Sequence, residues 1–562
     1  MKERDPRINW LLLLSAVGIA LWLLLAWAIE DPAHKPPSLG RLLMRTQDIP
    51  ALMIGCGLLA IGALGWRLAP IAGTRWASRG RLIFGVSIIS AIIAWTGRYW
   101  LMRDYALSRD EEVAEFATRS MSLGWLARPI PAEWIPYRRA IMPEFFSPFG
   151  ADRYWNAAYL PLNSAFRALC GLLGDPNIAA PILLVVGLIA LWRAATRLFP
   201  ERSDAVAVTM LMALTSAQLI VTAMTPYAMT AHFALNMLWL ALVLRGGRAG
   251  HGGAALVTLL LVGIHQYHYP LVFLAPFLLW FALGRRWGAL AWYSAVLLVA
   301  VAIWAKLWPH LLIDWYGPAA DVRPSAGVSD KLGSLVDRLD KWRPLLHLTR
   351  FLAWNNLLLV PLALVGLWRM DWRAAIRGER IELPLALGAF GMAALAIDQG
   401  YGWGYRYLHG FEGSLVLLAA FGFTRLRRAD MHPIWTASLI ALVTGSFLAA
   451  RAHQLVSGYA AAHRQMMSIN ADVVLLDWRG GFFATDLGRG DQGEPLGRPV
   501  IISMQHLDEA KIDALCDRHS VVIYDRSAFL RAGVIRAGWR NTRIDALRDH
   551  MAQRGCGRLF VP

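Results

Sequence analysis

The sequence predicts an all-α polytopic membrane protein, with about 13 transmembrane helices and a small C-terminal α/β domain outside the membrane. Three observations support this class. The 562 residues are 57% hydrophobic, with a mean hydropathy of +0.42. Several uncharged runs reach the roughly 17 to 25 residues needed to cross a bilayer. After the last run, the composition changes to short apolar stretches that alternate with amphipathic ones.

The transmembrane part is predicted from apolar runs such as "LLLLSAVGIALWLLLAWA" (11–28), which is too long for a signal peptide and is expected to be a retained anchor. The other runs are bounded by charged or Gly/Pro-rich segments. In chain order the expected spans are residues 11–28, 51–72, 82–102, 177–195, 205–224, 227–244, 254–269, 270–284, 287–308, 349–368, 383–398, 408–424 and 433–450.

The charge pattern assigns a side to each loop. The formal net charge is +17, but Lys and Arg are spread over short loops such as "RGGR" (245–248) and "TRLRRAD" (424–430). This distribution argues against a nucleic-acid-binding face and fits the positive-inside rule. We therefore expect these loops and the N-terminus "MKERDPR" in the cytoplasm, and the C-terminus outside.

Two domains follow from these assignments. Residues 1–450 form the transmembrane domain, and its outer-face loop 103–176 carries an acidic motif, "YALSRDEEVAEF" (105–116). Within this loop, "AAYLPLNSAFRALCGLLG" (157–174) is apolar on one helical face, which predicts a helix lying in the membrane interface. Residues 451–562 form the outer α/β domain.

The outer domain is predicted from apolar stretches of strand length. Strands are expected in 471–478, 499–504, 520–526 and 558–562, and helices in 507–518 and 543–555. Cys516 and Cys556 would share an oxidising space. A disulfide between them and two buried free thiols are both open at this stage.

Ionisable groups at membrane depth are costly and mark candidate sites. In the predicted topology all such groups lie at the outer ends of spans, which suggests one outward-opening cavity, although interfacial anchoring would also account for them. They are Asp110, Glu111, His265, His268, Lys306, Asp398 and Arg406.

Asp110 and Glu111 begin a helix-like segment just outside the third span. One interpretation is an acidic first turn favoured by the helix dipole. The other is a catalytic pair, in which Asp110 accepts the proton of an attacking hydroxyl as a general base.

Arg406 lies in "GYGWGYRY", a sequence of glycines and aromatics that favours a loop allowing close approach of a ligand. A guanidinium there can bind phosphate through two hydrogen bonds; the alternative is an arginine in an interfacial aromatic belt. We assign the neighbouring Tyr405 to substrate binding. Lys306 either snorkels to the interface or adds a second positive charge for the phosphate.

His265 and His268 are expected to bind substrate as a hydrogen-bonding pair in a polar cavity. Their spacing also suits a metal, but no third ligand is evident and no metal site is predicted. No cofactor is expected, and a divalent cation near Asp110 is left open. The sequence contains no GxSxG, HExxH or nucleotide-binding motif. It therefore gives no support to a serine hydrolase, a zinc protease or a nucleotide-driven pump.

The acidic pair outside an N-terminal span, the amphipathic segment after it and "GYGWGYRYL" far downstream together resemble the GT-C superfamily of membrane glycosyltransferases. The likeness is to the protein O-mannosyltransferase and aminoarabinose transferase type, and it covers roughly residues 82–425. It implies a GT-C-like fold, a polyprenyl-phosphate-linked sugar donor, Asp110 as the first-loop acid and Arg406 as the phosphate-binding arginine. The chain departs from the family pattern in having two spans before the one that leads to the acidic loop, and in its C-terminal domain.

The resulting expectation is a glycosyltransferase, hexosyl- or pentosyl-, in a bacterial inner membrane, with the C-terminal domain in the periplasm. Its acceptor would be a hydroxyl or amine on a lipid, glycan or protein. The alternative is a transporter or lipid flippase whose buried ions line a translocation path. That alternative lacks a visible inverted repeat.

Overall fold

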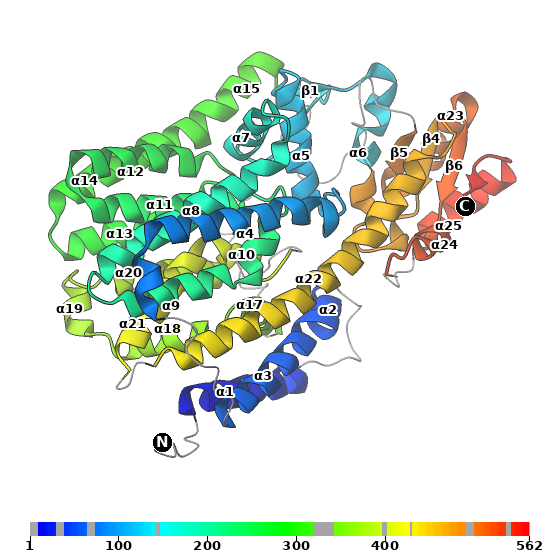
Figure 1. The fold of residues 1–562 in the computed structure, drawn as a ribbon. Coiled ribbons are helices and arrows are strands. Elements are labelled where there is room, and N and C mark those ends of the chain that lie inside the picture. Colours follow the sequence, from blue (N-terminus) through cyan, green and yellow to red (C-terminus); the bar gives the residue numbers. More distant parts are fainter. Residues whose placement is uncertain are drawn as a thin grey trace.

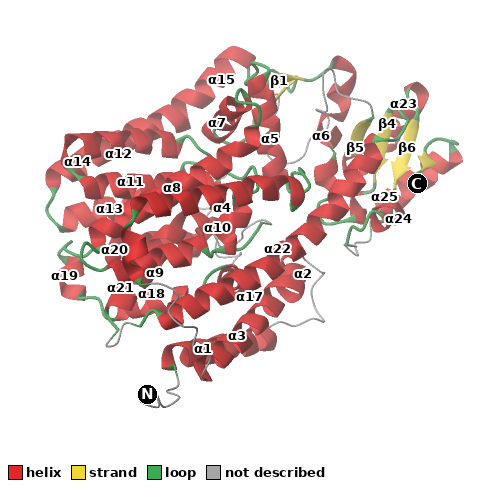
Figure 2. Cartoon of the chain, viewed as in Figure 1, coloured by secondary structure: helices red, strands yellow, loops and turns green. Residues whose placement is uncertain are grey.

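The computed structural model describes residues 9–29, 39–64, 73–141, 146–318, 342–395, 402–426, 430–488, 499–535 and 541–560. The candidate residue Asp398 and the basic N-terminus, residues 1–7, lie outside these ranges. Helices make up most of the described chain, and the strands gather in two small sheets (Figures 1 and 2).

The helical part is a set of apolar helices packed side by side (Figure 1). Small residues allow some of them to approach closely, as expected where helices associate without a hydrophobic driving force. Between α18 and α21, a Cβ added at Gly366 or Gly422 would meet the backbone of the other helix. The helices of this part are α1 (Trp10–Ile29), α2 (Leu39–Leu43), α3 (Ile49–Leu64), α4 (Gly80–Trp100), α8 (Ala179–Leu198), α9 (Ser203–Leu214), α10 (Ala217–Thr222), α11 (Met229–Arg245), α12 (Gly247–Val262), α13 (His268–Leu283), α14 (Trp287–Val301), α15 (Trp308–Tyr316), α17 (Trp342–Trp354), α18 (Leu359–Trp368), α19 (Trp372–Ile376), α20 (Glu382–Leu395), α21 (Glu412–Thr424) and α22 (His432–Met467).

Within the described residues, six helices are long and apolar enough to cross a membrane, or seven if one bent pair counts as a span. Four further apolar helices are shorter: Ser203–Leu214, Met229–Arg245, His268–Leu283 and Glu382–Ala394. The protein is therefore a membrane protein with several spanning helices, and the figure of about 13 spans stays a prediction.

Two of the expected spans are broken. The run 349–368 is divided between α17 and α18, which meet at an angle of 109°. Asn355 and Asn356 occupy the bend, where the Asn356 side chain accepts a hydrogen bond from the Leu358 amide at 3.0 Å. The run 205–224 is divided into α9 and α10 at Ser216, whose hydroxyl accepts from the Leu219 amide. Polar side chains that replace backbone partners are a usual cause of such breaks.

The segment predicted as the first outer loop is ordered into elements of its own. It contains α5 (Arg109–Ser122), α6 (Arg138–Ile141), α7 (Leu162–Gly171) and an antiparallel sheet of order β1-β3-β2, formed by Arg128–Pro129, Tyr154–Ala157 and Phe146–Phe149. The helix expected within 157–174 is α7, next to the exposed Leu172 and Leu173. Its place in the membrane interface stays a prediction.

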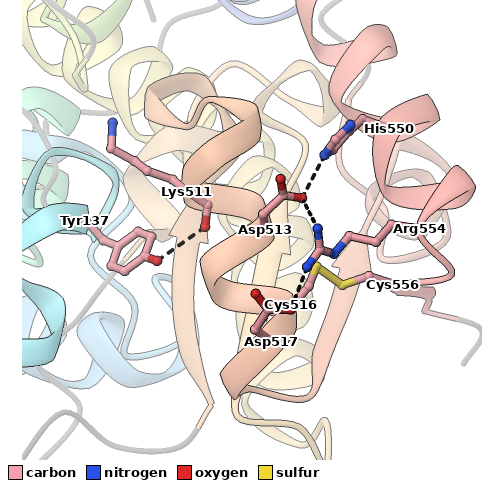
Figure 3. Close-up of a disulfide and its surroundings, with 8 residues drawn as sticks. All are labelled: Tyr137, Lys511, Asp513, Cys516, Asp517, His550, Arg554 and Cys556. Carbon is pink, nitrogen blue, oxygen red and sulfur yellow. Dashed lines mark hydrogen bonds and ion pairs between the residues drawn. A yellow bond between two sulfur atoms is a disulfide. The ribbon is translucent and has the colours of Figure 1, made fainter.

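The C-terminal part contains a parallel sheet of order β5-β4-β6-β7. Its strands are β4 (Val473–Leu476), β5 (Val500–Ser503), β6 (Val521–Tyr524) and β7 (Arg558–Leu559), and its helices are α23 (Glu509–Arg518), α24 (Arg526–Arg531) and α25 (Thr542–Gln553). Each expected strand and helix of this region has a counterpart here, and α24 was not foreseen. Cys516 and Cys556 form a disulfide that joins α23 to the chain after α25 (Figure 3).

The helix α22 connects the two parts. It is continuous from His432 to Met467 and runs from the helical bundle to the C-terminal sheet (Figure 1). The predicted boundary between residues 450 and 451 therefore falls inside one helix, because the polar residues after 450 continue it rather than end it.

Candidate active site

The acids of the motif, Asp110, Glu111 and Glu112, lie in the first turn of α5. Ser108 is the N-cap of this helix, and its hydroxyl accepts a hydrogen bond from the Glu111 amide at 3.4 Å. Consecutive residues of a helix project about 100° apart. Asp110 and Glu111 consequently enter different surroundings.

Asp110 forms an ion pair with Arg406, 296 residues away in the chain. The Arg406 Nη1 lies 2.5 Å from the Asp110 Oδ2, and only 5% and 12% of the two side chains are exposed. The Tyr159 hydroxyl donates a hydrogen bond to the other carboxylate oxygen. The structure thus brings together the two residues that the sequence placed on one side of the membrane.

The surroundings of Asp110 favour its ionised form. Burial raises the pKa of this carboxyl group, but the Arg406 guanidinium and the Tyr159 hydroxyl together outweigh burial, so that its pKa is lowered below the usual value. Asp110 is therefore a carboxylate at neutral pH, able to accept a proton.

Arg406 is surrounded by aromatic rings and retains one unused donor. Its guanidinium carbon lies 5.0 Å from the ring centre of Tyr227 and 5.3 Å from that of Tyr407, in the range of cation–π contacts. Its Nε is buried and has no hydrogen-bond acceptor among the described residues. Buried donors normally have a partner, so this atom can donate a hydrogen bond to a ligand oxygen.

The loop before Arg406 is held by Gln218 of α10. The Gln218 side-chain amide accepts from the Tyr405 backbone N–H and donates to the Tyr405 carbonyl, both at 3.0 Å. The Tyr405 ring stacks on His347, with ring centres 5.0 Å apart. Tyr405 consequently points away from the Asp110 pocket, and Tyr407 is the tyrosine of this motif that contacts Arg406.

Gly404 allows Gln218 to approach this loop, which leads to a prediction. Its φ is +65°, and a Cβ there would collide with the Gln218 side chain. We expect Gly404→Ala to lose about 1–2 kcal/mol from the left-handed backbone alone, and to displace Arg406. A thermal-shift measurement of the purified protein checks this. Gly288→Ala is the control, because a Cβ at Gly288 meets no atom within 4 Å; equal melting temperatures for the two variants would contradict the prediction.

His265 contributes a second unused polar atom to the same pocket. Its ring lies 4.0 Å from that of Tyr159, and its Nδ1 is buried with no hydrogen-bond partner among the described residues. His268 differs, because it is exposed and stacks on Tyr269. The two histidines therefore do not form the predicted pair, and only His265 lines the pocket.

Lys306 also lies apart from the pocket. It is exposed on a π-helical turn, Ala302–Leu307, and the pocket-lining residue of this region is Trp308, two positions later. Residues two positions apart in a helix project to nearly opposite sides, so Lys306 and Trp308 face different surroundings. The structure gives no support to Lys306 as a ligand of the phosphate.

Glu111 faces away from Asp110. One of its carboxylate oxygens accepts from the Leu107 amide at 3.2 Å, and both the Ser108 N-cap and the Tyr227 side chain are nearby. Burial raises the pKa of Glu111 to about 7, although the guanidinium of Arg98 acts in the opposite direction. This geometry resembles a capping box more than a catalytic pair.

This raised pKa predicts a pH-dependent stability. Because the pKa of Glu111 is higher in the folded chain than the ordinary value of 4.5, its contribution to stability is complete below that value and is lost as the pH rises through about 7. Glu111→Gln should remove this loss and raise the melting temperature relative to the wild type at pH 8 by roughly 2 °C or more, but not at pH 5. Thermal-shift scans at both pH values test this. An identical offset at pH 5 and pH 8 would contradict it.

The pocket around these groups combines polar and apolar walls. Its polar side chains include Asn156, Asn163 and Ser164, and the α5 residues Val113, Ala114 and Ala117 form an apolar wall. A carboxylate, a guanidinium with a free donor and an unpartnered imidazole nitrogen therefore face one narrow space. This combination can take a proton from a nucleophile and stabilise an anionic leaving group.

Sequence reasoning missed the tyrosines of this site. Tyr159, Tyr227 and Tyr407 lie in three different segments, and each contacts Asp110 or Arg406. Tyr407 had a signal in sequence, because it belongs to the same motif as Arg406. Within the described part of the chain, no group of three or more His, Cys, Asp or Glu side chains is arranged to hold a metal ion.

Neither a protein-family model nor a curated protein matches this chain. Two solved structures of ArnT from Cupriavidus metallidurans are similar to it, both at 12% identity. The apo structure matches over 72% of this chain and 83% of its own, with a TM-score of 0.43. The structure bound to undecaprenyl phosphate matches over 82% of this chain and 91% of its own, with a TM-score of 0.46.

Proposed function

We propose that this protein is a membrane glycosyltransferase that moves a sugar from a polyprenyl phosphate to a hydroxyl or amine acceptor. The observation that carries the proposal is the buried Asp110–Arg406 pair, in which the arginine retains an unused Nε beside the carboxylate. A base next to an anion-binding donor is the arrangement that transfer from a phosphate-linked sugar requires.

In the proposed reaction, the acceptor oxygen or nitrogen attacks the anomeric carbon of the sugar while Asp110 takes the acceptor's proton. The bond between the anomeric carbon and the phosphate oxygen breaks, and the polyprenyl phosphate leaves with the bonding electron pair. Arg406 stabilises the negative charge that develops on that oxygen. His265 can orient a sugar or acceptor hydroxyl through its unpartnered Nδ1.

Binding of the donor would also activate the base. In the present pair, Arg406 lowers the pKa of Asp110 and so weakens it as a base. A phosphate oxygen on the Arg406 Nε would share the positive charge and bring the Asp110 pKa back toward higher values. The carboxylate would then become more basic only when the donor is in place.

The site would open on the outer face of a bacterial inner membrane, with the N-terminus in the cytoplasm and the C-terminal part in the periplasm. The basic loops between the spans support this orientation. The prenyl tail would reach the site from the lipid, between apolar helices. The acceptor belongs to a lipid, a glycan or a protein.

Reconstitution separates this function from that of a flippase. The purified protein in proteoliposomes would be given a polyprenyl-phosphate-linked sugar together with a lipid extract of the source membrane, and products would be identified by mass spectrometry. We expect a new glycosidic product. Transbilayer movement of the donor without any such product would overturn the proposal in favour of a flippase.

A further inference from the structure

The C-terminal part of the chain contacts the first turn of α5 directly. Asp486 lies in a short 3-10 turn, Ala484–Leu487, and is 1% exposed. Its Oδ2 accepts a hydrogen bond from the Arg109 backbone amide at 3.1 Å. Its Oδ1 lies 3.3 Å from the Nε of the Arg109 side chain. One carboxylate therefore holds both the backbone and the side chain of the residue that precedes Asp110.

This contact is part of a larger interface. The outer segment and the C-terminal sheet share one hydrophobic core, to which Phe116, Trp134 and Ile141 contribute from one side and Leu475, Ile502 and Leu515 from the other. The ring of Trp134 stacks on that of His519 at 5.3 Å. The Tyr137 hydroxyl donates to the Lys511 carbonyl of α23 at 3.2 Å (Figure 3). The C-terminal part is thus built against the segment that carries Asp110.

Asp486 supplies a hydrogen-bond acceptor at the N-terminus of α5. The first N–H groups of a helix have no acceptor within the helix, and the Arg109 amide is the first of them in α5. Asp486 supplies that acceptor from a part of the chain 377 residues later. Its negative charge also suits the positive end of the helix dipole.

We propose that the C-terminal part braces the first turn of α5, with Asp486 as a positioning residue that holds Asp110 against Arg406. The catalytic half of this inference rests on the function proposed above. The brace itself is a property of the fold, because Asp486 fixes the backbone one residue before the base. Displacement of a reacting group by about 1 Å costs on the order of 100-fold in rate. Greater mobility of the first turn of α5 would therefore lower the turnover rate.

Two variants at Asp486 and one at Arg109 separate the components of the contact. Asp486→Ala removes the backbone bond and the ion pair. Asp486→Asn retains an oxygen for the Arg109 amide but loses the charge, and Arg109→Gln loses the ion pair while its amide remains. The matched control is Asp517→Ala. Asp517 lies on α23, away from α5, and its substitution removes an exposed ion pair with Arg554.

The first measurement is hydrogen–deuterium exchange of the full-length protein in detergent, followed on peptides that cover residues 105–116. We expect exchange in the first turn of α5 to be at least about tenfold faster in Asp486→Ala, because a broken cap frees the amides. Asp486→Asn and Arg109→Gln should lie between it and the wild type. The Asp517→Ala control should match the wild type.

The second measurement is sugar transfer by the same variants. Turnover should fall roughly 10- to 100-fold in Asp486→Ala, with a donor KM close to that of the wild type, and Asp486→Asn should restore most of it. Unchanged first-turn exchange in Asp486→Ala would overturn the brace, as would a purely KM-type defect. If the wild type transfers no sugar, the proposed function fails, and the exchange experiment alone decides whether the brace exists.

Discussion

Asp110→Asn is expected to reduce sugar transfer by about 10²- to 10⁴-fold, the usual contribution of a general base. The amide has the size of the carboxylate and still accepts the hydrogen bond from Tyr159, but it takes no proton from the acceptor. The test is complementation of a strain that lacks this protein, with the surface glycolipids and glycans analysed by mass spectrometry and the expression level of each variant measured in parallel.

The matched control for this variant is Asp104→Asn. Asp104 belongs to the same outer segment and also pairs with an arginine, since its Oδ1 lies 3.1 Å from the Nε of Arg98. Asp104 is half exposed and does not line the Asp110 pocket, so transfer should stay within about twofold of the wild type. Wild-type product levels in Asp110→Asn would remove the base from the mechanism.

Arg406→Ala is expected to reduce transfer by about 10²- to 10³-fold, because it removes the donor that stabilises the leaving phosphate. It also leaves the buried Asp110 without its counter-ion, which raises the pKa of that carboxyl group. Arg406→Lys retains the charge but not the planar fork of donors. It should therefore bind the donor more weakly than the wild type and transfer more slowly, while exceeding the alanine variant.

Binding of a polyprenyl phosphate to the purified variants, followed by native mass spectrometry, separates a binding defect from a folding defect. Arg377→Ala is the control, because Arg377 pairs with Glu379 at 2.7 Å on an exposed surface. It should bind as the wild type does. Equal binding by Arg406→Ala would show that this arginine does not hold the phosphate.

The sequence predicted those features of the fold that depend on local patterns. The strands around Val473, Val500 and Val521 and the helices between them follow from short apolar runs and helical periodicity. The broken helix at Asn355 and Asn356 had a signal, since two adjacent asparagines interrupt an apolar run. The continuation of α22 past residue 450 had none, because its polar second half is stabilised by packing against distant elements.

The sequence pointed to the two central residues of the candidate site, Asp110 and Arg406, but not to the side chains around them. Asp110 and Arg406 were assigned to the same face by charge and parity, but the contact between them spans 296 residues and no spacing rule gives it. Tyr405 and Tyr407 flank Arg406 equally in sequence. Only the hydrogen bonds to Gln218 decide that Tyr405 turns toward His347 and Tyr407 toward the arginine. The directions of Lys306 and His268 had no signal in sequence, because tertiary packing sets the direction of a side chain. Lys306 is exposed on a π-helical turn, and His268 begins α13 and stacks on Tyr269.

The most direct test of the proposed site is a structure of the full-length protein with a polyprenyl phosphate. The phosphate should lie in the Asp110 pocket with an oxygen at hydrogen-bonding distance, roughly 2.7–3.2 Å, from the Arg406 Nε. Tyr227 and Tyr407 should still flank the guanidinium. A phosphate bound elsewhere, with the Asp110–Arg406 pair unchanged and its Nε still unpartnered, would contradict the assignment of this pocket as the donor site.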